Sequence, residues 1–150
     1  MTPVQIPQRM NLATAAPKVF KAVLALDAAA RAGLDPVLVE LVQIRASQIN
    51  HCAYCIDHHI GDARKAGESE KRIHQLSAWE DSSLYTAEER AALALTEAVT
   101  LLPQGVCDAV YDEAAAHFGE KELAQLIALI FTVNAWNRMN VSTRRTPGTA

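Results

Sequence analysis

The chain has 150 residues, a formal net charge of −3 and three cysteines. This length is expected to give one domain, residues 1–150, with a core of its own. The acidic balance, with Arg144–Arg145 as the only basic run near a terminus, argues against nucleic acid as a partner. A small, odd number of cysteines argues against a secreted disulfide scaffold.

Neither a secretory signal nor a membrane span is expected. The N-terminal stretch MTPVQIPQRMN lacks the charged start and the apolar segment of a signal peptide. The longest apolar run, residues 126–133, is far shorter than the roughly 20 residues that cross a bilayer. We therefore expect a cytoplasmic protein with no membrane partner.

Helical signals follow one another along the whole chain, and no alternating strand pattern interrupts them. Gly33 ends a first helix, Asp35 and Pro36 begin a second, and Ser69 begins a fourth. Thr86 and Glu89 form a capping box. The helices are expected at residues 16–33, 35–49, 52–67, 69–79, 86–102, 106–118 and 120–142. The sequence thus predicts an all-α fold of six or seven helices, followed by a disordered tail at about 144–150.

The second of these helices is unusually apolar. The stretch PVLVELVQIRAS, residues 36–47, is apolar around most of its circumference and needs cover on more than one face. A domain of this size offers limited cover, so we expect neighbouring subunits to supply some of it. This indicates a homo-oligomer.

The stretch HCAYCIDHHI, residues 51–60, concentrates the chemically reactive side chains. On a helix that advances about 100° per residue, Cys52 lies roughly 60° and His59 roughly 40° to the same side of Cys55. His58 falls on the opposite side of Cys55, and His51 precedes the helix. The reactive face is therefore predicted to hold Cys52, Cys55 and His59.

This face can form a catalytic thiol system. The field at a helix N-terminus favours a thiolate at Cys55 in the first turn. His59, one turn further on, can take the thiol proton. Cys52 is close enough in sequence for a disulfide with Cys55.

A third group is expected to orient the histidine. If the helices at 35–49 and 52–67 form an antiparallel hairpin, residues whose numbers sum to about 99 or 100 lie side by side. Glu40 would then lie level with His59, and Ser47 level with Cys52. A carboxylate at Glu40 could fix the imidazole tautomer and raise its basicity. The alternative is that Glu40, Gln43 and Ser47 form the solvated stripe of their helix.

Glu40, Ser47 and the segment CAYCIDHH together resemble the core signature of the alkylhydroperoxidase AhpD-like family, within the carboxymuconolactone decarboxylase superfamily. The shared pattern is a glutamate twelve residues before Cys-x-x-Cys and a histidine four residues after its second cysteine. The later segment NAWNRMNVSTR also looks typical of that family, and the resemblance spans roughly residues 20–140. It implies an all-helical single domain, with a catalytic hairpin at about 35–67, that assembles into trimers or hexamers.

The resemblance also implies an activity and residue roles. Cys55 would attack a hydroperoxide, Cys52 would resolve the product as a disulfide, and His59 would be the base with Glu40 as its relay partner. An external dithiol, of the lipoyl type, would reduce the disulfide, and neither cofactor nor metal would be required. Some peroxidases of the family have a histidine directly before the second cysteine. Here Tyr54 takes that place, and a phenol is a poor proton acceptor near neutral pH.

Three other functions remain as alternatives. Zinc could bind Cys52, Cys55 and His59, with a fourth ligand from His51, His58, His74 or Cys107, although a second separated ligand pair is missing. A redox-sensing or disulfide-exchange module could act on a protein thiol. The decarboxylase branch of the superfamily acts on lactones by acid–base chemistry, and the complete Cys-x-x-Cys motif weighs against it.

The remaining candidates have structural interpretations. Cys107, which follows Val106 in an apolar helix, is expected to be a small buried side chain. His74 and His117 are expected at the surface or at helix ends. Trp136 is expected to pack in the core or in a subunit interface, and Arg138 to pair with an acid. Substrate contact by the segment Trp136–Asn137–Arg138 is the less favoured alternative.

Overall fold

The computed structural model describes residues 1–148, which contain eight α-helices, two short 3-10 helices and no strand. The elements are α1 (Leu12–Ala15), α2 (Pro17–Arg31), α3 (Pro36–Ile49), α4 (Ala53–Lys65), α5 (Glu70–Gln75), η1 (Leu76–Asp81), α6 (Ala87–Thr100), η2 (Leu102–Gln104), α7 (Asp108–His117) and α8 (Glu120–Thr143). The predicted all-α fold is confirmed. Within the described part of the chain, no helix is both long and apolar enough to cross a membrane.

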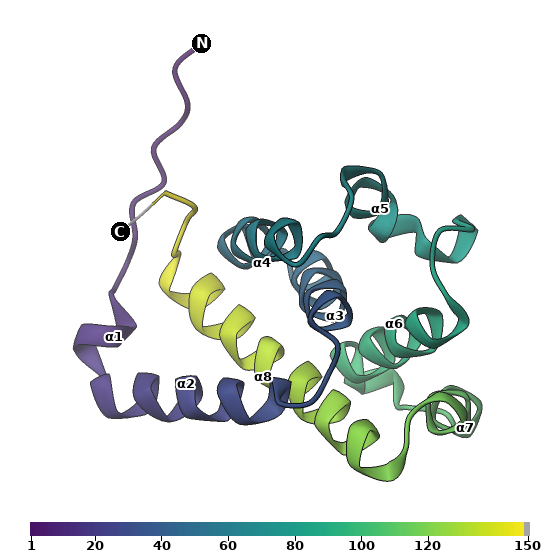
Figure 1. Ribbon diagram of the computed structural model, residues 1–150. Helices are drawn as coiled ribbons and strands as arrows, with labels where there is room; N and C mark the ends of the chain where they lie inside the picture. Colours follow the sequence, from purple (N-terminus) through teal and green to yellow (C-terminus); the bar gives the residue numbers. More distant parts are fainter. Residues whose placement is uncertain (149–150) are drawn as a thin grey trace.

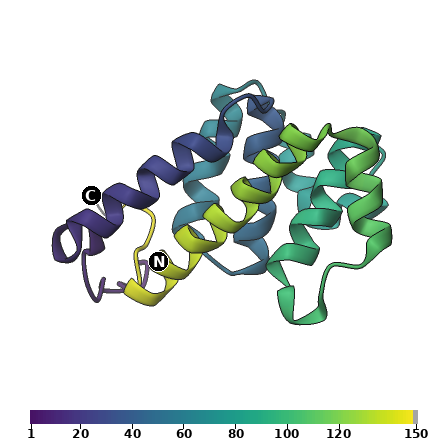
Figure 2. The same ribbon diagram turned by 90° about the horizontal axis from the view of Figure 1, so that it is seen from below.

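A central helix, α3, and an antiparallel pair of helices, α2 and α8, organise the molecule. Helix α3 contacts α4, α6 and α8, so it lies at the centre of the fold (Figure 1). Helix α2 lies along α8 and runs in the opposite direction, which brings the start of α2 close to the end of α8 (Figure 2). Residues more than a hundred positions apart therefore meet between these two helices.

The predicted helix starts agree with the observed caps. Asp35 accepts the backbone N–H of Leu38 at the start of α3, and Ser69 accepts that of Arg72 at the start of α5. Thr86 and Glu89 form the predicted capping box of α6. These local side-chain contacts satisfy N–H groups that the first turn of a helix leaves unpaired.

The number of α-helices is one above the predicted range. The additional helix is α1, a single turn that Asn11 caps by accepting two backbone N–H groups. It is separate from α2 because the backbone leaves the helical conformation at Ala16, directly before Pro17. A proline disfavours the helical conformation of the residue that precedes it, which explains the break.

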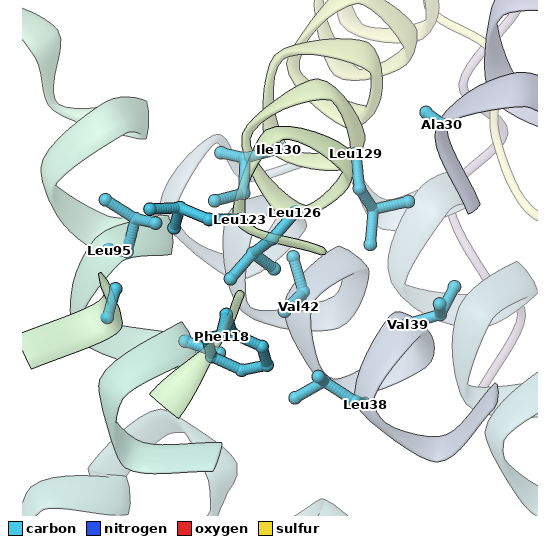
Figure 3. Packing of buried hydrophobic residues seen from close by; sticks show 12 residues of the cluster. Ala30, Leu38, Val39, Val42, Leu95, Phe118, Leu123, Leu126, Leu129 and Ile130 are labelled. Carbon is cyan, nitrogen blue, oxygen red and sulfur yellow. The ribbon is translucent and has the colours of Figure 1, made fainter. Parts of the chain in front are cut away.

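The apolar core has two clusters that share α3, one with α8 and one with α4, η1 and α6. Leu126 of α8 lies next to Val42 of α3, and Ile130 lies on the side of Leu95, in one cluster with Phe118, which precedes α8 (Figure 3). Nine of the fourteen residues of α3 are buried within the chain itself. The expected cover for α3 therefore comes from the same protomer.

Exposed apolar side chains are instead concentrated near the N-terminus. Val4, Ile6 and Met10 precede α1 and are exposed, as are Val19 and Leu26 of α2. In an oligomer, this exposed apolar surface is therefore a better candidate for burial between subunits than α3.

The segment predicted to be disordered begins with ordered contacts. Arg144 ends α8 in the left-handed conformation, with φ 56°, and the backbone N–H of Arg145 donates to the carbonyl of Asn140 at 2.9 Å. The backbone N–H of Arg9 donates to the carbonyl of Thr143, which joins the N-terminal segment to the end of α8. Residues 149–150 of the predicted tail lie outside the described residues.

Candidate active site

The α3–α4 hairpin brings Glu40 and His59 together. Nδ1 of His59 lies 2.9 Å from Oε2 of Glu40, and the two residues are only 5% and 4% exposed. About two turns away, the backbone N–H of Cys52 donates to the carbonyl of Ser47 at 3.0 Å. The predicted register of the hairpin is therefore confirmed at both positions.

The polar side chains of α3 are buried. Glu40, Gln43 and Ser47 all face the interior, so the alternative that they form a solvated stripe is wrong. Ser47 donates to the carbonyl of Gln43 and accepts a hydrogen bond from Asn137 of α8 at 2.9 Å. Burial of polar side chains is stabilising only where such partners exist, so these contacts fix α3 against α8.

The two motif cysteines form a disulfide at the start of α4. Cys52 is the N-cap, Cys55 is in the first turn, and their Cα atoms are 5.3 Å apart. Both residues are buried. The structure thus shows the oxidised form of the pair that the sequence predicts to cycle between dithiol and disulfide.

The Glu40 carboxylate defines which nitrogen of His59 is available. A carboxylate only accepts hydrogen bonds, so its contact favours the tautomer with the proton on Nδ1. Nε2 then carries the lone pair. His59 and Cys55 line the same cavity.

Asn140 contacts the Cys55 sulfur, and sequence reasoning missed this residue. Its Nδ2 lies 3.4 Å from Sγ of Cys55, and the residue is buried. Asn134, Asn137 and Asn140 follow one another at intervals of three, which places them on successive turns of α8. Asn50 donates to the first two, at 2.9 Å each. This spacing was the available signal for an amide row facing the cysteine hairpin.

Cys55 lines a cavity of about 230 Å³. Three regions of the chain build its walls: Phe20, Leu24, Asp27 and Arg31 of α2, Tyr54, Cys55, His58 and His59 of α4, and Trp136, Asn140 and Arg145 at the end of the chain. Cys55 lines the cavity whereas Cys52 does not. The cavity therefore distinguishes the two cysteines by access.

Tyr54 forms part of the cavity wall. Its ring stacks on that of His58 at 6.0 Å between centroids, and the guanidinium of Arg145 lies over it at 3.9 Å. The position that the family can fill with a histidine thus holds an aromatic platform in this chain. His58, predicted to lie away from the reactive face, also reaches the cavity.

Trp136 packs within its own chain, between α8 and α2. Its Nε1–H donates to Oδ1 of Asp27 at 3.2 Å, and its ring meets Phe20 edge-on. Both contacts hold α2 against the end of α8, beside the cavity. Helix α2 is a component of the site that the motif alone did not predict.

Two predictions about single residues are wrong. Cys107 is exposed at the N-cap of α7, because that helix begins only at Asp108 and leaves the thiol outside the apolar contacts. Arg138 donates to the backbone and side-chain oxygens of Asn134 one turn back, so within the described residues it bonds to an amide and not to an acid. His74 and His117 are exposed, as predicted.

The residues predicted as alternative zinc ligands are not assembled around the cysteines. Both cysteine sulfurs are in the disulfide. In residues 1–148, the one group of three metal-ligating side chains within reach of one another is His58, His59 and Asp62, whose donor atoms lie within 4.8 Å. Asp62 accepts a hydrogen bond from Lys65, which lowers the pKa of this carboxyl, and nearby His58 lowers it further.

An all-helical domain with a buried Glu–His pair beside a Cys-x-x-Cys helix start defines an AhpD-like protein. A sequence model of the carboxymuconolactone decarboxylase family matches residues 17–98, and the chain belongs to this family. The resemblance found from the sequence is confirmed.

Individual relatives support the same assignment. Uncharacterized protein YdfG of Bacillus subtilis is 38% identical over 137 residues, which cover 90% of this chain and 93% of YdfG. A crystal structure from Agrobacterium tumefaciens, of a protein of unknown function also named as antioxidant defence protein AhpD, is 37% identical. It superposes with a TM-score of 0.92 over 96% of this chain and 100% of that one.

More distant structures share the fold alone. A peroxidase-related protein from Ralstonia eutropha with an alkylhydroperoxidase AhpD core has 21% identity and a TM-score of 0.79, over 91% of this chain and 74% of its own. The debrominase Bmp8 has 23% identity and a TM-score of 0.72, over 91% and 72%. One fold therefore hosts more than one chemistry, so function has to be argued from the site.

Proposed function

We propose that the protein is a cysteine-based peroxidase that reduces hydroperoxides through a Cys52–Cys55 dithiol/disulfide cycle. The observation that carries this proposal is the placement of Cys55 and His59 on one cavity, with buried Glu40 behind His59 at 2.9 Å and Cys52 bonded to Cys55. Nucleophile, base, orienting carboxylate and resolving thiol are then all present without a metal or an organic cofactor.

The first step oxidises Cys55. Nε2 of His59 takes the thiol proton, and the helix N-terminus together with the Asn140 amide stabilises the thiolate. The sulfur attacks the outer oxygen of the hydroperoxide, the O–O bond breaks, and the alkoxide takes a proton from His59. The products are an alcohol and a sulfenic acid on Cys55.

The second step forms the Cys52–Cys55 disulfide. The Cys52 sulfur attacks the sulfenic sulfur, water leaves, and the disulfide seen in the structure forms. An external dithiol then supplies two electrons and two protons, and its own disulfide is the second product. A lipoyl-type dithiol is the reductant that membership in this family suggests.

The burial of the disulfide favours a small oxidant over a protein thiol. Cys52 and Cys55 are 1% and 3% exposed, so the sulfur is reached through the cavity. A folded protein partner cannot approach a sulfur at this depth without opening the site, whereas a hydroperoxide can. Disulfide exchange with protein substrates is therefore the less favoured function.

Stopped-flow consumption of cumene hydroperoxide by the reduced protein tests the proposal. Cys55→Ser is expected to abolish the reaction, whereas Cys52→Ser should keep one rapid turnover and lose the following ones. Cys107→Ser is the matched control, because it removes an exposed thiol outside the cavity. Full activity of Cys55→Ser would overturn the assignment of the nucleophile.

A further inference from the structure

Charged side chains form part of the wall of the cavity beside Cys55. Its charged walls are Asp27, Arg31 and Arg145, that is, one carboxylate against two guanidinium groups. The two arginines differ in whether a carboxylate of the described residues pairs with them.

Arg31 is fully engaged. It forms an ion pair with Asp27 at 2.9 Å, lies 3.6 Å from Glu40, and contacts the side-chain oxygen of Gln43 at 3.5 Å. Asp27 in turn uses its second oxygen to accept from Trp136. Arg31 therefore balances carboxylates that are already part of the site.

Arg145 has no such balance. Among the ion pairs of residues 1–148, none involves Arg145, and its guanidinium lies on the face of Tyr54. A ring face attracts a cation but leaves its charge in place and its N–H donors available. The left-handed turn at Arg144 and the hydrogen bond from Arg145 N–H to Asn140 direct this side chain over the cavity.

The size and walls of the cavity indicate an organic substrate. A volume of about 230 Å³ is much larger than hydrogen peroxide requires, since one water occupies about 30 Å³ of liquid. Phe20 and Leu24 of α2 and Trp136 of α8 supply apolar wall, and the Tyr54–Arg145 stack lines the same cavity. An apolar frame with one anionic end would match these walls.

We propose that the preferred substrate is an organic hydroperoxide that carries a carboxylate, and that Arg145 is the residue that binds this carboxylate. This inference rests on the proposed peroxidase function. The apolar frame lies against Phe20 and Trp136, and the peroxide group reaches Cys55. The carboxylate takes no part in the oxygen transfer, and it leaves unchanged on the alcohol product.

A pair of hydroperoxides with one frame tests the proposal. Reduced protein is assayed with cumene hydroperoxide and with its para-carboxylate, 4-(2-hydroperoxypropan-2-yl)benzoate, using dithiothreitol as an uncharged reductant. Wild type is expected to prefer the carboxylate by about tenfold in kcat/KM, the range of a hydrogen bond to a charged group. Arg145→Gln should reduce the ratio to about one.

Arg144→Gln is the matched control. It removes the same charge one residue away, at an exposed position that does not line the cavity. It should leave the preference for the carboxylate intact. Absence of a preference in wild type, or an equal preference in Arg145→Gln, would overturn the proposal.

Binding of the unreactive 4-isopropylbenzoate, measured by calorimetry on the oxidised protein, separates this inference from the proposed function. If neither hydroperoxide is turned over, the peroxidase proposal fails. Weaker binding of this carboxylate to Arg145→Gln than to wild type and Arg144→Gln would still support the anion site. Equal binding by all three proteins, or no binding to wild type, would reject it.

Discussion

Glu40 is buried with His59 as a hydrogen-bonding partner, so removal of its charge should change the basicity and the tautomer of His59. Glu40→Gln keeps the shape but removes the carboxylate that favours the Nδ1–H tautomer and stabilises the imidazolium. We expect kcat/KM for hydroperoxide to fall by about 10- to 100-fold, as for other residues that orient a functional histidine.

The exposed pair Glu113–His117 offers a matched control for this change. Glu113 and His117 are 3.2 Å apart on α7, away from the cavity, so Glu113→Gln should leave the kinetics unchanged. Equal activity of Glu40→Gln and wild type would show that Glu40 has only a structural role.

Asn140 should act on the reactivity of the Cys55 sulfur. Its amide is a donor to Sγ in the disulfide form, and a donor of this kind stabilises a thiolate more strongly. In a Cys52→Ser background, Asn140→Ala is expected to slow alkylation of Cys55 by iodoacetamide about tenfold at pH 7. Asn140→Asp should slow it further, because it places a carboxylate against the thiolate. Alkylation at the wild-type rate in both variants would contradict this role.

At the scale of elements, the α3–α4 hairpin was predictable and the rest of the site was not. Local sequence information was sufficient to locate four residues of this hairpin. Cys52, Cys55 and His59 follow from a Cys-x-x-Cys helix start with a histidine one turn further on. Glu40 follows from the pairing expected in an antiparallel hairpin, where residue numbers sum to about 99 or 100. The contributions of α2 and of the end of α8 depend on how distant helices pack. That packing is carried by contacts such as Trp136 with Asp27, which no local pattern predicts.

Errors at single residues have the same origin. Cys107 was placed in a helix predicted to begin at residue 106, but the helix begins at Asp108, and a shift of two residues moves a side chain from the interior to the surface. The sequence also left open a solvated stripe at Gln43 and Ser47, because their partners, Arg31 and Asn137, lie on other helices.

The connection between η1 and α6 contains a tyrosine that should make stability sensitive to alkaline pH. Tyr85 is buried and donates its hydroxyl to the carbonyl of Arg72; burial raises its pKa to about 12 from the ordinary value of 10.0. The folded state then holds the phenol proton more tightly than the unfolded state. Stability from this group is present below pH 10 and is lost as the pH rises toward 12.

Thermal unfolding at pH 8 and pH 11 measures this effect. Tyr85→Phe should lower Tm at pH 8, since it loses a hydrogen bond of about 1 kcal/mol, but its Tm should fall less than that of wild type between the two pH values. Tyr111→Phe is the control, because Tyr111 is exposed. A wild-type decrease equal to that of Tyr85→Phe would refute the role of this phenol.

At the scale of the whole molecule, assembly is the open prediction. Family membership suggests a trimer or a hexamer, and exposed apolar residues such as Ile6 and Val19 are available for contacts between copies. Light scattering coupled to size exclusion should give three or six times the protomer mass of 16.3 kDa. A mass of one protomer at micromolar concentration would contradict this expectation.

The most direct test of the catalytic account is mass spectrometry of the reduced protein after one equivalent of hydroperoxide. We predict the loss of two hydrogens, a Cys52–Cys55 crosslink in the peptide that holds both residues, and a free Cys107. In Cys52→Ser, a trapping reagent for sulfenic acid should label Cys55. Oxidation that falls on Cys107, or label on Cys52 in a Cys55→Ser protein that still consumes peroxide rapidly, would contradict the account.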